Sequence, residues 1–465
     1  MNPRALAAAT PHTRDRYVDL LRVGSIAVVV IGHWLMAVPT TTPGKIVAGN
    51  ALQSSPALQY LTWIFQVMPI FFVVGGFADF AALRNEPTYA EFVASRVRRL
   101  LAPTAVFVAV WVAVALATEA TGRQRGMTEL AAGSVAQPLW FLGVYLAVVG
   151  LAPAMLRWHW RHGVAVPVVL AAAAIGVDAA RFGLGVPQFG LLNLALVWLA
   201  VHQLGYLYAD GTLLRRGVAA AMAVGGLAAV VTLTGFGGYP VSMVGMPGEP
   251  VSNMNPPTVA LLAHAIWLTG AVLLLRDRAR RWLADRRVWT VVVAANGVVM
   301  TVFLWHLSAL FGGYALALGL GVPLPAPATA AWWLTRPLWL AALTVPAATL
   351  VAVFRRAELP GARTGAQPNR TTERAATGDR QGERGGARPA GHRALAAAGV
   401  AVAALGILAV SVVGFAALLA GHTVVLVVLP VNLPLAVGLV VAGAALTLAA
   451  RARLPVPVAR PAEGG

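Results

Sequence analysis

The stretch Asp19-Leu-Leu-Arg22-Val-Gly-Ser-Ile-Ala-Val-Val-Val-Ile-Gly-His33-Trp34 is apolar enough to enter a bilayer, yet it carries an arginine and a histidine. At about 100° per residue, Arg22 and His33 are offset by three turns plus roughly 20°, so both side chains lie on one face of a helix. They are ~16 Å apart along its axis, about half the thickness of the hydrocarbon core. Ionisable side chains at this depth are costly, and they usually have a function.

The composition of the whole chain indicates an all-α polytopic membrane protein. Of its 465 residues, 58% are apolar and 11% are charged, and apolar runs of about 18 residues or more recur along it. The absence of cysteine excludes disulfides, thiolate metal sites and cysteine nucleophiles. The net charge of +18 is almost all arginine. In a membrane protein such charge marks the cytoplasmic side, so no nucleic-acid partner is expected.

The hydropathy pattern predicts a core of ten membrane-spanning helices, followed by a linker and two appended spans. The ten predicted spans cover about 19–38, 58–82, 100–118, 138–156, 163–182, 190–209, 218–236, 257–275, 288–320 and 333–354. The corresponding domains are a cytoplasmic N-terminus (1–18), a membrane domain (19–354), a disordered basic linker (355–393), the appended spans (394–450) and a tail (451–465).

Three local features of the spans lead to further predictions. Pro69 with the pair Gly75-Gly76 predicts a kink and a close helix approach in the second span. The arginine-rich connection 276–287 is expected to be a short interfacial helix end. The stretch 288–320 is too long for one straight span, and it is expected to tilt or break near Gly312-Gly313.

Arginine placement predicts the orientation of the chain. No cleavable signal sequence precedes the first span, which is therefore expected to act as a signal anchor. With the N-terminus in the cytoplasm, the linker, the tail and most arginines face inward, as the positive-inside rule requires. The basic residues then left outside are Lys45, Arg123, Arg125, Arg181 and Arg336. Both termini are expected to be cytoplasmic.

Two side chains of the opening stretch are candidates for chemistry. His33 could be a general base that deprotonates a hydroxyl, because imidazole titrates near neutral pH, or it could be hydrogen-bonded to a neighbouring helix. Arg22 could bind the phosphate of a nucleotide-like cosubstrate, or it could pair with Asp19 three residues earlier.

A second basic cluster lies at the same predicted membrane surface. Arg96 and Arg99 are three residues apart and share a helix face. Alone, they are more simply explained as inward-facing charges. Together with Arg22, and with His33 half a bilayer deeper, they suit a cosubstrate that has a phosphorylated head and a reactive end reaching into the membrane.

Other polar groups leave alternatives open. For His264 and His306, a structural hydrogen bond is at least as plausible as catalysis. The loop before the eighth span contains Glu249, Asn253 and Asn255. It could bind a hydroxylated acceptor or form a re-entrant turn.

Five segments in order resemble the acyltransferase-3 family of bacterial integral-membrane O-acyltransferases. They are Arg22 and His33 separated by ten residues, Pro69-Ile-Phe-Phe-Val-Val-Gly75-Gly76-Phe77, Arg96-x-x-Arg99 with Pro103, Gln137-Pro-Leu-Trp140-Phe-Leu142, and Phe303-Leu-Trp-His306. The resemblance covers about residues 14–356. Gly75 stands where the family has serine, which removes any role of that hydroxyl here.

The resemblance implies a ten-helix enzyme that transfers an acyl group from cytoplasmic acyl-CoA to a hydroxyl of a carbohydrate, glycolipid or related acceptor. It places the protein in the bacterial cytoplasmic membrane. His33 would be the catalytic base, and no metal and no cofactor other than the acyl-CoA cosubstrate is expected. The residues implied at the CoA end are Arg22, Arg96 and Arg99. The residues expected to support the active site are Trp140, His306 and Asn255.

Two other functions are compatible with the polar intramembrane groups. A transporter or flippase of glycolipids could use them to line a path. A haem protein could use His33, His264 or His306 as axial ligands. The appended spans could be a partner-docking pair or a spacer, and no protein partner is predicted.

Overall fold

A computed structural model describes residues 3–11, 13–42, 45–85, 87–246, 248–357, 389–416, 418–419, 421–426 and 429–452. Within this part of the chain, twelve helical segments are long and apolar enough to cross a membrane. They match the ten core spans and the two appended spans in order, which confirms the all-α polytopic class.

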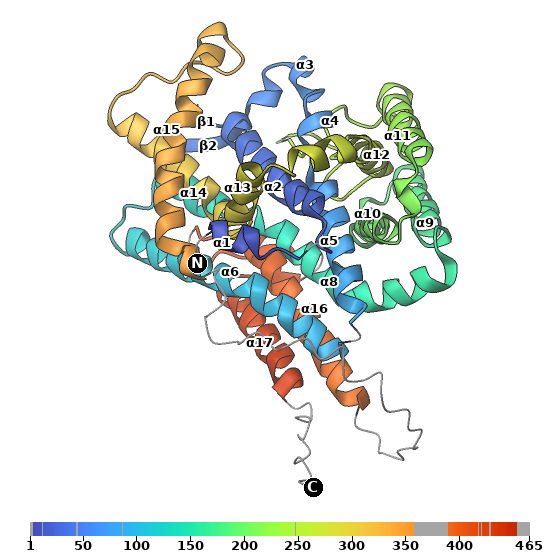
Figure 1. Cartoon of the computed structure of the whole chain (residues 1–465). Helices are drawn as coiled ribbons and strands as arrows, with labels where there is room; N and C mark the ends of the chain where they lie inside the picture. Colours follow the sequence, from blue (N-terminus) through green and yellow to red (C-terminus); the bar gives the residue numbers. More distant parts are fainter. Residues whose placement is uncertain are drawn as a thin grey trace.

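Helices account for most of the described chain (Figure 1). Those of the first half are α1 (Pro3–Ala8), α2 (Arg16–Met36), α3 (Pro56–Gln59), α4 (Thr62–Phe65), α5 (Met68–Leu83), α6 (Tyr89–Ala120), α7 (Met127–Ser134), α8 (Leu139–His162) and α9 (Ala165–Gly183). Those of the second half are α10 (Asn193–Ala209), α11 (Arg216–Phe236), α12 (Val259–Trp282), α13 (Arg286–Asn296), α14 (Val299–Gly319), α15 (Ala330–Phe354), α16 (Pro389–Val413) and α17 (Leu433–Ala452).

Short elements join the spans. The 3-10 helices are η1 (Ala51–Gln53), η2 (Pro187–Leu192), η3 (Thr212–Leu214) and η4 (Arg355–Ala357). Two antiparallel hairpins accompany the helices: β1 (Ala37–Thr42) pairs with β2 (Lys45–Asn50), and β3 (Val424–Leu426) pairs with β4 (Leu429–Val431).

The predicted kink in the second span is present: the helix breaks between Phe65 and Met68, just before Pro69. Helix α5 begins at Met68, and Pro69 occupies its first turn. Proline is well accommodated there, because the N–H that it lacks would have no partner inside the helix. The residues before it form the separate short helices α3 and α4. The break in the second span therefore lies before the proline.

The predicted close approach at Gly76 is confirmed. A Cβ atom at Gly76 would lie 2.1 Å from the carbonyl oxygen of His202, and one at Gly205 would lie 2.2 Å from the carbonyl oxygen of Val73. Backbones of α5 and α10 are thus in direct contact, as small residues allow in membrane proteins. The contact fixes α5 beside α10 beneath the site described below.

Replacing Gly76 with alanine is expected to destabilise the protein by about 1–3 kcal/mol, because overpacking at a rigid backbone contact forces the helices apart. The matched control is Gly225→Ala in α11, where a Cβ would meet nothing within 4 Å. Thermal unfolding in detergent micelles should separate the two variants. Equal melting temperatures would show that the α5–α10 contact is not tight.

Helix α6 begins about three turns before the predicted start near residue 100. Thr88 caps its N-terminus: the backbone N–H of Glu91 donates to Thr88 Oγ1 (3.3 Å), and the backbone N–H of Thr88 donates to Glu91 Oε2 (2.9 Å). This reciprocal pair is a helix-start signal that hydropathy does not register. As a result, Arg96 and Arg99 lie within the helix rather than before it.

The predictions for residues 276–320 need one correction. Residues 276–282 form the end of α12, as predicted, and a separate short helix, α13, follows. The break before α14 falls at 297–298, whereas α14 runs unbroken through Gly312-Gly313. Gly313 serves packing, since a Cβ there would lie 2.4 Å from Leu343 Cδ2 of α15.

Helix α13 starts at a well-defined cap. The carboxylate of Asp285 accepts hydrogen bonds from the backbone N–H groups of Val288 (3.1 Å) and Arg287 (2.7 Å), and these bonds lower the pKa of Asp285. Trp289 and Val292 then pack against Tyr17 of α2. The helix is thereby fixed to the start of the span that carries His33.

Most of the predicted linker lies outside the described residues. Of residues 355–393, the structure describes 355–357, which form η4, and 389–393, which open α16. The tail after residue 452 also lies outside them. The appended helices α16 and α17 pack against each other and beside α6 and α8 (Figure 1).

Candidate active site

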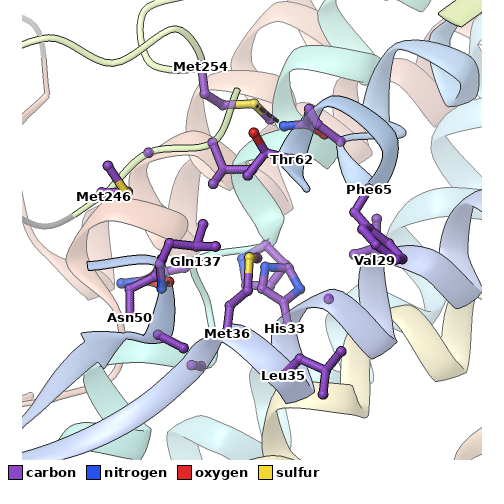
Figure 2. Close-up of a pocket in the computed structure, with 18 of the residues that line it drawn as sticks. Val29, His33, Leu35, Met36, Asn50, Thr62, Phe65, Gln137, Met246 and Met254 are labelled. Atoms are coloured by element: carbon purple, nitrogen blue, oxygen red, sulfur yellow. Dashed lines mark hydrogen bonds between the residues drawn. The ribbon is translucent and has the colours of Figure 1, made fainter. Parts of the chain in front are cut away.

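A cavity of about 680 Å³ lies within the helix bundle, with His33 of α2 in its wall (Figure 2). Its sides come from α2, α5, α8 and α14, and one end is bordered by the β1–β2 hairpin, α3, α4 and the loop 244–255. Apolar and aromatic side chains dominate the lining, among them Phe65, Phe141, Phe303 and Trp333. A pocket of this size and character suits an organic substrate.

The polar lining groups are uncharged amides and hydroxyls together with His33. No aspartate, glutamate, lysine or arginine lines the cavity among the described residues. Asn50, Gln137 and Asn255 reach it from three separate segments. Burying a charge in such surroundings without a partner is costly, so the cavity favours a neutral occupant.

His33 forms a hydrogen bond with a second histidine from a distant helix. The distance between His33 Nδ1 and His306 Nε2 is 3.0 Å, and the ring centroids are 5.0 Å apart. His306 Nδ1 lies 2.6 Å from the carbonyl oxygen of Phe303, which can only accept, so this nitrogen carries a proton. In a neutral His306, Nε2 is then the acceptor, and His33 Nδ1–H is the donor. His33 Nε2 is left without a proton, as a base requires.

The surrounding backbone holds His306 in place. Its side chain is buried, with 1% of its surface exposed. The indole N–H of Trp34 donates to the carbonyl oxygen of His306 (2.9 Å). The sequence left open a structural or a catalytic role for His306. The structural hydrogen bond is present, and it joins His306 to His33, the candidate base.

The three predicted arginines lie near one another but in different surroundings. Arg22 pairs with Asp19 at 3.4 Å, the alternative contact expected from the sequence. Arg96 pairs with the buried Asp79 at 2.9 Å. Arg99 is exposed and has no carboxylate partner among the described residues, and it lies within electrostatic range of Arg22.

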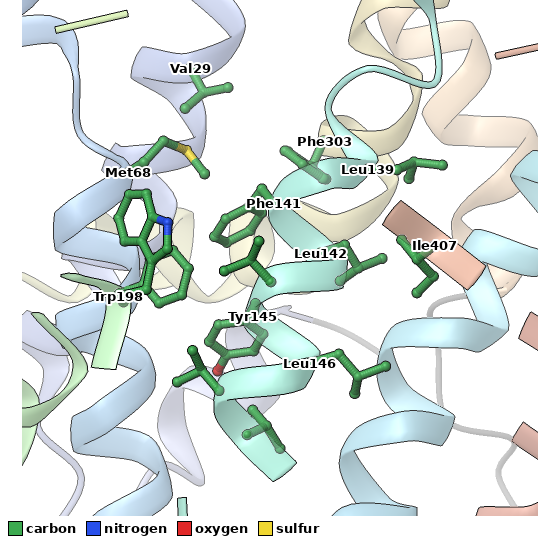
Figure 3. Close-up of a cluster of buried hydrophobic side chains, with 14 of the residues drawn as sticks. Val29, Met68, Leu139, Phe141, Leu142, Tyr145, Leu146, Trp198, Phe303 and Ile407 are labelled. Carbon is green, nitrogen blue, oxygen red and sulfur yellow. The ribbon is translucent and has the colours of Figure 1, made fainter. Parts of the chain in front are cut away.

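Tyr145 occupies the space beside Gly75. A Cβ atom at Gly75 would lie 2.6 Å from Tyr145 Cε2 and 2.9 Å from its hydroxyl oxygen, so a serine does not fit there while Tyr145 keeps this position. The hydroxyl lies within electrostatic range of Arg22, Arg96 and Arg99. Figure 3 shows Tyr145 on α8, next to Phe141 of the cavity wall. It thus lies between the arginines and the cavity.

The other predicted support residues divide into lining and anchoring groups. Trp140 and Asn255 line the cavity together with His33. His264 does not: its Nε2 donates to the carbonyl oxygen of Gln66 (2.8 Å), and its Nδ1 accepts from the indole of Trp267 (3.0 Å). Both ring nitrogens of His264 are therefore engaged, and its role is to position Gln66.

Asp79 and His202 were not identified from the sequence. Asp79 is fully buried on α5, and its carboxylate also contacts His202 Nε2 of α10 (3.3 Å). An acidic residue within an apolar run usually has a functional or structural role, so Asp79 could have been identified from the sequence. Its partner on α10 could not be found that way, because 123 residues separate the two.

These features define a polytopic membrane protein with a histidine-centred cavity inside its helix bundle and an arginine cluster nearby. Comparison with protein families matches an acyltransferase domain to residues 15–356. The chain therefore belongs to the acyltransferase-3 family and is an integral-membrane O-acyltransferase. The match confirms the resemblance and its extent, and it gives no support to a transporter without acyl-transfer chemistry. No curated protein and no solved structure matches the chain.

Proposed function

We propose that this enzyme transfers an acyl group from acyl-CoA to a hydroxyl of a neutral carbohydrate, glycolipid or related acceptor, with His33 as the general base. The observation that carries the proposal is the hydrogen bond from His33, which lines the cavity, to the buried His306 behind it. It directs an unprotonated Nε2 away from His306 and holds the ring in one orientation. A base acts efficiently only when it is positioned within hydrogen-bond reach of the proton it removes.

The arginine cluster supplies the binding site for the donor head. Guanidinium groups bind phosphate through paired hydrogen bonds, and the head of CoA carries several phosphates. Arg99 makes the direct contact, because Arg22 and Arg96 already have carboxylate partners. Those two add positive charge and shape the site. No further cofactor and no metal are needed for this chemistry.

In the proposed reaction, His33 alone carries the proton from the acceptor hydroxyl to the leaving sulfur. His33 Nε2 accepts the proton of the acceptor hydroxyl, and the oxygen attacks the thioester carbonyl carbon. The new C–O bond forms and the C–S bond breaks, and the leaving CoA sulfur takes the proton from His33, which returns to its neutral form. The products are the acyl ester and CoA–SH. Amides such as Gln137 and Asn50 in the cavity wall can donate to the oxyanion that develops on the carbonyl.

The acceptor enters from the end bordered by the β1–β2 hairpin and the loop 244–255. By the positive-inside rule, this end faces away from the cytoplasm, and the arginine cluster and both termini face the cytoplasm. The membrane we propose is the bacterial plasma membrane. The uncharged and largely apolar lining favours a neutral acceptor with an apolar portion. This arrangement brings donor and acceptor to His33 from opposite sides.

Proteoliposomes that contain the purified enzyme test the proposal. They receive acetyl-CoA with a radiolabelled acetyl group, together with a lipid extract of the producing cells. Label should enter the lipid fraction, and free CoA should appear in equal amount, only when protein, donor and extract are all present. CoA release without labelled product would indicate hydrolysis, and no release with any short-chain donor would contradict acyl-CoA as the substrate.

His306 acts on the reaction through His33, so it is a positioning residue. His306→Ala removes the acceptor of the His33 Nδ1–H bond, and it is expected to lower kcat by about 10–100-fold with little change in the KM for acyl-CoA. His306→Gln, whose side-chain oxygen can accept the same bond, should recover part of the loss. Steady-state kinetics on both variants check this. Equal activity of alanine and glutamine variants would contradict the orienting role.

A further inference from the structure

The appended helices are built into the catalytic domain although they lie outside residues 15–356. Two glycines on one face of α8 admit α16 at close range. A Cβ at Gly143 would lie 2.7 Å from Leu408 Cγ, and one at Gly150 would lie 2.9 Å from Val400 Cγ1. Figure 3 shows Ile407 of α16 near Leu142 of α8, on the side of the helix away from Trp198. The pair is therefore neither a spacer nor a detached module.

The end of α16 is anchored beside the cavity. The backbone N–H of Phe415 donates to the carbonyl oxygen of Ala132 in α7 (2.7 Å). The Phe415 ring is fully buried and stacks on Trp111 of α6 with a centroid distance of 6.1 Å. Gly414 has a φ of +67°, and its backbone touches Gly133. A directional backbone bond and a buried ring together fix the position of the last turn of α16.

This anchoring places Ser411 and Val412 in the wall of the cavity that contains His33. The Ser411 hydroxyl donates to the carbonyl oxygen of Leu408 in its own helix (2.7 Å), so it does not need a partner in the cavity. Val412 keeps 47% of its surface exposed. The wall contributed by α16 is thus small in volume and apolar.

We propose that α16 forms the acceptor-side wall of the catalytic cavity and that Val412 limits the size of the acceptor that can reach His33. Residues 414–415, directly after α16, contact α7, and α7 in turn contacts strand β2 of the hairpin that borders the acceptor end. This places the last turn of α16 at the acceptor end and away from the arginine cluster. The proposal rests on the proposed function for the identity of the occupant. The contact of α16 with the cavity is independent of it.

The absence of cysteine in the chain allows a direct test. Val412→Cys carries a single thiol in the cavity wall. Its matched control is Leu435→Cys at the corresponding end of α17, where the side chain has the same exposed fraction of 47%. Each variant is treated with methyl methanethiosulfonate or with the bulkier benzyl methanethiosulfonate. Transfer from radiolabelled acetyl-CoA into the lipid extract is then measured.

Labelling of Val412→Cys is expected to reduce transfer in proportion to the size of the label, with a loss of about tenfold or more for the benzyl group. Labelling of Leu435→Cys to the same extent should leave transfer unchanged. Equal effects at the two positions, full transfer after benzyl labelling at position 412, or failure of Val412→Cys to react would each overturn the proposal.

A second measurement does not depend on activity. In nanodiscs, octyl glucoside below its micelle concentration serves as a neutral amphipathic probe of the cavity. It should slow labelling of Val412→Cys and leave labelling of Leu435→Cys unchanged, and equal rates with and without the probe would count against the proposal. If the untreated enzyme shows no transfer, the proposed function fails, and this protection result still decides whether α16 borders the occupied cavity.

Discussion

Replacing His33 with asparagine is expected to reduce acyl transfer by about 10²–10⁴-fold, the usual contribution of a positioned general base. Asparagine can still present an N–H group toward His306 Nε2, as His33 Nδ1 does at 3.0 Å. It has no group that can accept a proton at the position of His33 Nε2. The substitution therefore removes the base and retains the contact between α2 and α14.

Release of CoA from acetyl-CoA in the presence of the lipid extract measures this effect. The loss should appear in kcat, with the KM for acyl-CoA nearly unchanged, because the arginine cluster is untouched. The melting temperature of His33→Asn in detergent should stay close to that of the unmodified enzyme. Full turnover by the correctly folded variant would falsify the role of His33 as base.

Replacing Asp79 with alanine is expected to destabilise the protein by about 3–5 kcal/mol, the cost of leaving a buried charge without its partner. The Asp79 carboxylate is fully buried, and it contacts Arg96 Nη2 at 2.9 Å and His202 Nε2 at 3.3 Å. It joins α5, α6 and α10 beneath the cavity. Without it, the Arg96 guanidinium has no carboxylate to hold it in the cluster. Donor binding should weaken along with stability.

Two further variants make this expectation specific. Asp79→Asn retains an oxygen that can accept from Arg96, so its loss of stability should be smaller. Asp277→Ala removes a carboxylate whose side chain is 83% exposed and lies 3.7 Å from Arg276, and it should change stability by no more than about 1 kcal/mol. The melting temperatures of Asp79→Ala, Asp79→Asn and Asp277→Ala are measured in the same detergent. A similar shift for Asp79→Ala and Asp277→Ala would show that the buried contact is not stabilising.

The sequence-based predictions agree with the structure better in some parts of the chain than in others, for physical reasons. Spans were predicted well because hydrophobicity summed over about 20 residues is a strong local signal. Their ends were predicted less well where capping decides them, as at Thr88 and Asp285. The break predicted near Gly312-Gly313 was misplaced, because a glycine in a helix can also admit a neighbouring helix, as Gly313 admits Leu343 of α15.

The sequence by itself determined the class of protein, the order of its spans, its family and the placement of Arg22 and His33 on one helix face. Each of these depends on local composition, on helical periodicity or on short ordered motifs. Only the tertiary structure decided that His33 pairs with His306, 273 positions away, and that α16 lines the same cavity. Such contacts depend on which helices can approach at glycines and which buried polar groups find partners. Neither property is encoded in any single segment.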